Sequence, residues 1–207
     1  MKIIPKQYGF TFQANSYLIV NDSNEAVAID LGGDYHECVS YLEENNITLT
    51  KILLTHGHFD HIQGVAGTVE ATGAEVYIHK DDAKMLSGDE TCLAYMFGTS
   101  VSPVSKYNVF SDGDTIDFSG VPIKVIHTPG HSKGSCTFQM EDVLFTGDTL
   151  FRLSMGRTDF PDSDDNEMHE SLKKLKSMYS GSNDFAVLPG HNNSSTLSFE
   201  VKNNPCL

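Results

Sequence analysis

Residues 55–61 are Thr55-His56-Gly57-His58-Phe59-Asp60-His61, with three imidazoles and one carboxylate in the last six positions. They directly follow Lys51-Ile52-Leu53-Leu54, a short apolar run typical of a buried strand. A loop at the end of a strand can direct alternate side chains toward one point. Imidazole nitrogens and carboxylate oxygens are ligands of Zn²⁺ and similar divalent ions, and one ion takes about three or four of them. This segment alone predicts a metal site.

Three further donors end other apolar runs, each directly after a glycine. They close the segments Thr128-Pro129-Gly130-His131, Phe145-Thr146-Gly147-Asp148 and Leu188-Pro189-Gly190-His191. Glycine lets the backbone turn sharply and approach a site without a Cβ clash. A lone histidine after a strand is more often structural than a ligand, but the first cluster makes these strand ends candidates. More donors than one ion needs predict a second metal and hydrolytic chemistry. The candidate metal ligands are His56, His58, Asp60, His61, His131, Asp148 and His191.

Size and composition indicate one soluble globular domain. The chain has 207 residues, 39% of them hydrophobic and 20% charged, which suits a single domain over residues 1–207. The segment Met1–Gln7 lacks the apolar core of a signal peptide, and no apolar run approaches the ~18 residues of a membrane span. We therefore expect a cytoplasmic protein without a membrane partner.

Charge and cysteine content exclude further classes. The formal net charge of −14 opposes binding to nucleic acid, which needs Lys and Arg to replace counterions. The four cysteines form no CxxC pair, so a cysteine zinc site or a thioredoxin-type redox pair is not expected. Free, mostly buried thiols in a reducing compartment are the simplest prediction. The cysteines are Cys38, Cys92, Cys136 and Cys206.

Expected strands and helices alternate through much of the chain. Apolar periodicity and turn residues predict strands at 15–20, 26–30, 51–55, 75–79, 115–118, 121–127, 136–140, 142–146 and 185–188. Helices are predicted at 35–45 with Asp34 as N-cap, at 62–72, briefly from Asp81, at 167–178 and at 194–202, with a loop or partial lid at 87–110. Both halves have a β-rich-then-α order, which fits two sheets packed face to face with helices outside.

The combined motifs resemble the metallo-β-lactamase superfamily. They are HxHxDH, Pro-Gly-His-Ser, Thr-Gly-Asp and Pro-Gly-His, in this order from residue 56 to 191. The resemblance implies an α/β fold of the αββα sandwich type, with two mixed sheets flanked by helices and the site at one edge of the sheets. Asp30, in Ala28-Ile29-Asp30-Leu31-Gly32, matches the superfamily's early strand-end Asp, a structural residue or one that supports the ligands.

Within the superfamily the chain is most similar to the glyoxalase II branch, the hydroxyacylglutathione hydrolases. That resemblance implies one metal at the positions of His56, His58 and His131. It implies a second metal at Asp60, His61 and His191, with Asp148 bridging both. The bridging Asp148 argues against a true β-lactamase.

The run Gly156-Arg157-Thr158-Asp159 bears on the substrate. Glyoxalase II carries a basic residue at the position of Arg157 and uses it to hold glutathione, but has an aromatic shortly afterwards, where this chain has Asp159. We also expect no separate C-terminal glutathione-binding helical domain, because the chain stops at Leu207. The chain thus resembles a short bacterial glyoxalase II-like group. Arg157 is the predicted substrate-binding residue; the alternative is a surface ion pair with Asp159.

The implied function is a dinuclear metal-dependent hydrolase, a thioesterase of the hydroxyacylglutathione hydrolase type. Two divalent ions, zinc by expectation and iron or manganese as alternatives, share a water and lower its pKa toward ~7. The bridging hydroxide then attacks a thioester carbonyl, while the catalytic carboxylates Asp60 and Asp148 orient it. The expected partner is a small-molecule (thio)ester, with glutathione as one candidate carrier.

Three alternatives stay open at this point. A persulfide dioxygenase with a single iron would use His56, His131 and Asp148, and carries the same motifs. A hydrolase of another ester is the second, and a non-catalytic metal-binding domain the third. Metal stoichiometry, redox activity and turnover on esters discriminate among them.

Overall fold

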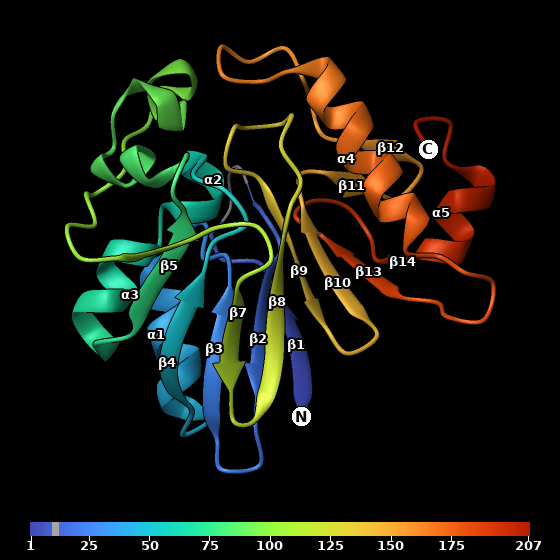
Figure 1. Cartoon of the computed structure of the whole chain (residues 1–207). Helices are drawn as coiled ribbons and strands as arrows, with labels where there is room; N and C mark the ends of the chain where they lie inside the picture. Colours follow the sequence, from blue (N-terminus) through green and yellow to red (C-terminus); the bar gives the residue numbers. More distant parts are fainter. Residues whose placement is uncertain (10–12) are drawn as a thin grey trace. The chain divides into compact units, whose positions relative to one another are not determined.

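The computed structural model describes residues 1–9 and 13–207, which form two compact units, Met1–Val109 and Phe110–Leu207. Two six-stranded mixed sheets are present, one built by the first half of the chain and one by the second, each with helices beside it (Figure 1). The predicted α/β class with two mixed sheets flanked by helices is therefore confirmed. The single domain over residues 1–207 stays a prediction.

The first sheet has the strand order β1-β2-β3-β4-β5-β6. β1, β2 and β3 pair antiparallel, whereas β3, β4 and β5 pair parallel. Parallel neighbours end at the same edge, so Asp30, which follows β3, lies beside the end of β4: its N–H donates to the carbonyl oxygen of Leu53, the last residue of β4, at 3.0 Å. The elements are β1 (Lys2–Lys6), β2 (Ser16–Val20), β3 (Glu25–Ile29), α1 (Tyr35–Glu44), β4 (Thr48–Leu53), α2 (Phe59–Ile62), α3 (Val65–Thr72), β5 (Glu75–His79), η1 (Ala83–Ser87), η2 (Glu90–Cys92), η3 (Ala94–Phe97) and β6 (Asn108–Phe110).

The second sheet has the order β14-β13-β10-β9-β8-β7. β10 and β13 are parallel, and both β8 and β10 are antiparallel to β9. β8, β10 and β13 therefore run in one direction, and the loops that follow them leave from one edge. Those loops carry His131, Asp148 and His191. The elements are β7 (Thr115–Phe118), β8 (Val121–His127), β9 (Cys136–Met140), β10 (Val143–Gly147), β11 (Leu150–Phe151), β12 (Ser154–Met155), α4 (Asp165–Ser177), β13 (Ala186–Pro189), β14 (Ser195–Thr196) and α5 (Leu197–Asn203).

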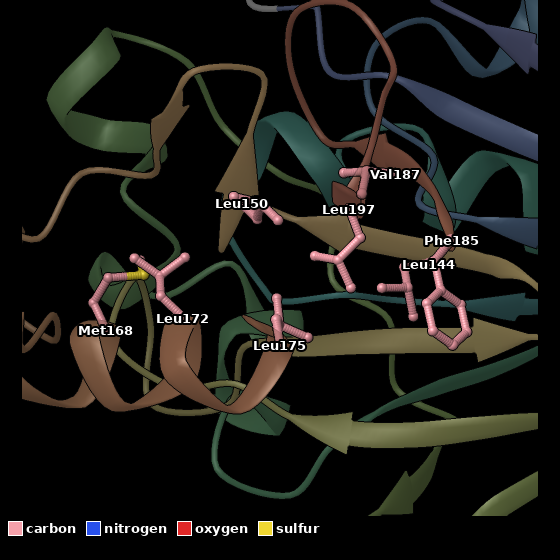
Figure 2. Packing of buried hydrophobic residues seen from close by; sticks show 8 residues of the cluster. All are labelled: Leu144, Leu150, Met168, Leu172, Leu175, Phe185, Val187 and Leu197. Carbon is pink, nitrogen blue, oxygen red and sulfur yellow. The ribbon is translucent and has the colours of Figure 1, made fainter. Parts of the chain in front are cut away.

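Helix α4 covers part of the second sheet with one apolar stripe. Its N-cap Asp164 accepts hydrogen bonds from the N–H groups of Asn166 and Glu167, which satisfies donors that the helix itself leaves open. The buried side chains on α4 recur every three or four residues, as an amphipathic helix requires. The resulting core cluster, shown in Figure 2, comprises Leu144, Leu150, Met168, Leu172, Leu175, Phe185, Val187 and Leu197.

Several boundaries differ from the prediction in the first half. The predicted helix 62–72 corresponds to α3, which begins only at Val65, because Gly64 directs its N–H to Leu31 O at 2.9 Å. A separate short helix, α2, precedes it within the segment expected to be a loop. The predicted strand 51–55 is β4, which begins at Thr48 and ends at Leu53. The predicted short helix from Asp81 is the 3₁₀ helix η1, and the predicted loop 87–110 contains η2, η3 and β6.

Some short strands were not predicted. β1 contains Pro5, which argues against a strand, yet β1 is the edge strand of its sheet, where a missing N–H is tolerated. β11, β12 and β14 have two residues each, too few for a periodic signal. The predicted helix 194–202 begins later, at Leu197, because Thr196 caps it by accepting from the Phe199 N–H.

The prediction of free, mostly buried thiols is confirmed. All four cysteines are free; Cys38, Cys92 and Cys136 are buried and Cys206 is partly buried. None of the described helices has the length and apolar character needed to cross a membrane.

Leu172 offers a direct test of the α4 cluster. Leu172 is 1% exposed, so Leu172→Ala should leave a cavity and lower the free energy of unfolding by about 2–5 kcal/mol. The melting temperature should fall by roughly 5–15 °C in a calorimetric scan. The matched control is Lys173→Ala, one residue further along the helix and 70% exposed, which should change little. Equal melting temperatures for both variants would contradict this account of the core.

Candidate metal centre

Four predicted ligands gather after β4. His56, His58 and His61 are buried, and the ring centroid of His56 lies 4.7 Å from that of His58 and 4.1 Å from that of His61. α2 begins at Phe59, so Asp60 shares a helical turn with His61, and its Oδ2 lies 3.9 Å from His61 Nε2. Three imidazoles and a carboxylate thus lie together, as the HxHxDH motif predicts.

Asp30 fixes the orientation of two of these imidazoles. It is 1% exposed, and its Oδ1 accepts the Thr55 N–H at 2.8 Å. Its Oδ2 accepts the Thr55 hydroxyl at 2.8 Å and lies 2.9 Å from His61 Nδ1. An ionised carboxylate only accepts hydrogen bonds, so the proton of neutral His61 is on Nδ1 and the lone pair is on Nε2. The Thr55 hydroxyl already donates to Asp30, so its 3.1 Å contact with His56 Nδ1 places the His56 proton on Nδ1 as well.

Asp82 is a supporting residue that the sequence did not reveal. It is fully buried, and its Oδ2 accepts the N–H of Gly57, inside the motif, at 3.1 Å. Gly57 has no room for a side chain, since a Cβ would lie 2.6 Å from the Cβ of Met85. The place of Asp82 in the chain could have indicated this role, because Asp82 follows β5, the third of the parallel strands that end at this edge of the sheet.

The three ligands predicted in the second half also meet. Asp148 Oδ2 lies 3.4 Å from His131 Nε2 and 3.5 Å from His191 Nε2. Asp148 and His131 are buried, whereas the His191 side chain is 28% exposed. One carboxylate oxygen therefore faces two imidazole nitrogens.

The segment after β12 supports this second cluster. His131 Nδ1 lies 2.8 Å from the carbonyl oxygen of Arg157, and a carbonyl only accepts, so Nδ1 carries the proton and Nε2 faces Asp148. The backbone of Gly156 approaches so closely that a Cβ there would lie 1.9 Å from the carbonyl oxygen of Asp148. The sequence singled out Arg157 for its side chain, but its carbonyl is what contacts a candidate ligand.

The Arg157 side chain forms the ion pair that the sequence offered as the alternative to substrate binding. Its Nε and Nη2 donate to the two carboxylate oxygens of Asp159, each at 2.8 Å, and its guanidinium lies 4.5 Å from the ring centroid of Phe160. The hydrogen bond from Arg157 lowers the pKa of the Asp159 carboxyl. Both side chains are largely exposed, so the guanidinium is accessible to a solute.

The donor chemistry of both clusters fits transition-metal ions. Neutral imidazoles with the proton on Nδ1, as inferred for His56, His61 and His131, suit zinc, iron or manganese when carboxylates lie beside them. A metal-binding histidine usually donates its other ring N–H to a carboxylate or a backbone carbonyl, as His61 and His131 do.

Asp30→Asn tests the support of His61. Asn keeps one acceptor oxygen but turns an amide NH₂ toward His61 Nδ1, which favours the tautomer with the proton on Nε2. We expect a 10–100-fold loss of zinc affinity, measured by competition with a chromophoric chelator, in a protein with an unchanged circular dichroism spectrum. The control is Asp34→Asn, because Asn still caps α1. Wild-type zinc affinity in Asp30→Asn would refute the tautomer argument.

Comparison with known proteins agrees with this chemistry. The sequence profile of the metallo-beta-lactamase superfamily matches residues 9–191, which include every candidate ligand. Hydroxyacylglutathione hydrolase GloC of Haemophilus influenzae is 32% identical, over 95% of this chain and 93% of that protein. The structure of TTHA1623 in a di-iron-bound form is 33% identical with a TM-score of 0.87, covering 99% of this chain and 100% of that one.

A second solved structure is also similar along its whole length. BLEG-1 B3 metallo-beta-lactamase is 31% identical with a TM-score of 0.89, and 98% of each chain is covered. These matches support a metal-dependent hydrolase. Because the profile covers most of the chain and both ligand clusters, the protein belongs to the metallo-β-lactamase superfamily.

Proposed function

We propose that this protein is a thioesterase of the hydroxyacylglutathione hydrolase type. The observation that carries the proposal is the position of Asp148, whose Oδ2 faces the Nε2 atoms of both His131 and His191. A carboxylate shared between two ligand sets is what the glyoxalase II resemblance implies. The similarity to GloC, whose name states this activity, supports it.

In this proposal, residues of both clusters would jointly bind two divalent ions. His56, His58 and His131 would bind one ion, and Asp60, His61 and His191 the other, with Asp148 common to both. When bound, such ions supply Lewis acidity and lower the pKa of water toward ~7. Zinc is the expected metal, and the di-iron form of TTHA1623 makes iron the first alternative.

The protein's own groups then hold protons and charge in place. Asp30 and the Arg157 carbonyl keep the protons of His61 and His131 on Nδ1 throughout the reaction. The carboxylates of Asp60 and Asp148 accept hydrogen bonds from the attacking water and orient it toward the thioester carbonyl. The single GxSxG run, Gly130-His131-Ser132-Lys133-Gly134, lies in the loop between β8 and β9 and not at a strand-to-helix turn, and its Ser132 is fully buried. This context favours direct attack by water over an acyl-enzyme.

The proposed partner is a small-molecule thioester in the cytoplasm, and neither nucleic acid nor membrane is part of the proposal. Arg157 would bind an anionic group of the thiol carrier, such as a glutathione carboxylate, in exchange for Asp159. A guanidinium suits this task because it binds carboxylates through two parallel hydrogen bonds.

A β-lactam is the second candidate substrate, because BLEG-1, which is 31% identical to this chain, is named a B3 metallo-beta-lactamase. The resemblance to glyoxalase II argues against a β-lactam, because it implies that Asp148 bridges two metals, which is not expected of a true β-lactamase. A chromogenic cephalosporin assayed beside the thioester separates the two candidates.

Metal dependence tests the thioesterase directly. The metal-free protein should not hydrolyse S-lactoylglutathione, and reloading with zinc, manganese or iron should restore turnover at about two ions per chain. Asp148→Asn should lower kcat/KM by about 100-fold or more. Asp142→Asn is the control, since Asp142 is exposed just before β10, whereas Asp148 follows that strand.

No thioester turnover in any metal form would refute the proposal. Oxygen consumption with a persulfide substrate, by a form with one iron per chain, would point instead to the dioxygenase. Cephalosporin hydrolysis alone would favour the β-lactamase.

The role of Arg157 has a separate kinetic test. Arg157→Ala should raise KM for S-lactoylglutathione about 5–10-fold with kcat nearly unchanged, as expected for loss of one exposed ionic contact. Asp159→Asn should lower KM, because the guanidinium no longer has a competing carboxylate. Lys124→Ala, on the exposed side of β8, is the control for general charge effects. An unchanged KM in both Arg157→Ala and Asp159→Asn would show that the pair is a surface ion pair only.

A further inference from the structure

A buried carboxylate on the C-terminal helix α5 binds the turn between β11 and β12. Glu200 of α5 is fully buried, and its Oε2 accepts the Leu153 N–H at 2.8 Å and the Asn204 side-chain amide at 2.9 Å. Its Oε1 accepts the hydroxyl of Ser195. A buried carboxylate is costly unless it is hydrogen-bonded, and here three donors serve it. One of them belongs to the turn between β11 and β12.

Asn204 holds the same turn from the other side. Its Nδ2 donates to Phe151 O at 3.1 Å and to Ser154 O at 3.0 Å, in addition to Glu200. These carbonyls belong to the last residue of β11 and the first of β12. We call Glu200 and Asn204 the α5 clamp, and residues 150–155 the ligand hairpin.

The ligand hairpin needs this restraint because its tip is strained. Leu153 has φ 59° and is 45% exposed, so burial of its side chain does little to offset the strain. A left-handed conformation is unfavourable for a residue with a Cβ, because the Cβ then lies too close to the following carbonyl oxygen. Such strain persists when surrounding contacts over-determine the backbone, and the α5 clamp supplies contacts on both sides of Leu153.

The ligand hairpin and the two residues after it contact all three candidate ligands of the second half. The Phe151 ring lies edge-on to His191, with centroids 5.9 Å apart. Beyond the hairpin, Gly156 lies against the Asp148 carbonyl, and the Arg157 carbonyl receives the Nδ1 proton of His131. Any shift of the hairpin therefore moves the groups that orient His131, Asp148 and His191.

We propose that Glu200 and Asn204 are positioning residues for the metal centre, acting through the ligand hairpin. The inference rests on the metal sites of the proposed function but not on the thioester chemistry. Metal affinity depends on ligand orientation, and loss of outer contacts typically costs 10–100-fold. Glu200 of the α5 clamp lies 69 residues after His131 and 52 residues after Asp148 in the sequence.

Isosteric variants separate hydrogen-bond polarity from packing. Asn204→Asp keeps Oδ1, which accepts the Cys206 N–H at 2.9 Å, but loses the donor to Phe151 O and Ser154 O. It also brings a second carboxylate to Glu200. Glu200→Gln should be tolerated, because Oε2 remains an acceptor and the Ser195 hydroxyl can reverse to accept from the new amide. Glu200→Leu removes both acceptors.

The experiment titrates the metal-free full-length protein with cobalt(II) and records its visible spectrum. Asn204→Asp and Glu200→Leu should bind cobalt 10–100-fold more weakly and show an altered spectrum at saturation. Glu200→Gln should stay within about threefold of wild type, on the argument that its hydrogen bonds survive. The matched control is Asn203→Asp, at the preceding residue and the last of α5, whose exposed amide donates to the helix backbone at Phe199 O. The saturated spectrum is the decisive readout, because it reports ligand geometry and does not follow from lower stability alone.

Wild-type cobalt affinity and spectrum in a folded Asn204→Asp would overturn the proposal. If Asn204→Asp does not fold, Asn204→Ala decides by the same two readouts, since it removes the donor without adding a charge. A loss in Glu200→Gln as large as in Glu200→Leu would also contradict the hydrogen-bond account. Cobalt binding with these differences but no thioester turnover would refute the proposed function and leave this inference intact.

Discussion

A neutral imidazole can offer one nitrogen to a metal only while the other nitrogen keeps its proton, and that proton needs an acceptor. This requirement explains much of the buried polar structure around the candidate ligands. In the first half the acceptor for His61 is a carboxylate, Asp30, which also holds Thr55. In the second half the acceptor for His131 is a backbone carbonyl, that of Arg157. The ligand motifs are therefore incomplete as a description of the site.

Strand direction brings these partners together. β3 and β4 are parallel, so Asp30 and Thr55 leave the first sheet at the same edge, and β5 adds Asp82 there. β8, β10 and β13 share a direction in the second sheet, so Asp148 meets two histidines that follow other strands. Each half thus uses the ends of co-directional strands, where loops can place polar groups without interrupting the ladder.

Sequence patterns predicted the repeated and the chemically unusual parts of this structure. Long periodic elements such as α4 and β8 were predicted to within two residues of their ends. The candidate ligands stood out because several imidazoles rarely follow one strand so closely. The ligand hairpin was missed, because two-residue strands carry no period. Asp82 and Glu200 were missed for another reason: an acidic residue outside a motif looks the same in sequence whether it is solvated or buried as an acceptor. Only the fold shows which donors face it.

The two halves differ in how firmly their candidate ligands are supported. The partners of His56 and His61 follow neighbouring strands of one sheet, so the backbone ladder itself fixes Asp30 relative to Thr55. The support of His131 passes instead through a short hairpin with a left-handed tip, held by side chains of a helix. The backbone hydrogen bonds between paired strands form cooperatively and allow few other arrangements. The clamped hairpin instead depends on a few side-chain hydrogen bonds, each worth about 1 kcal/mol. Substitutions in α5 or the ligand hairpin can therefore shift His131 and His191 without disturbing either sheet. In a superfamily that places different reactions on one fold, this second cluster is the one that sequence change can tune most readily.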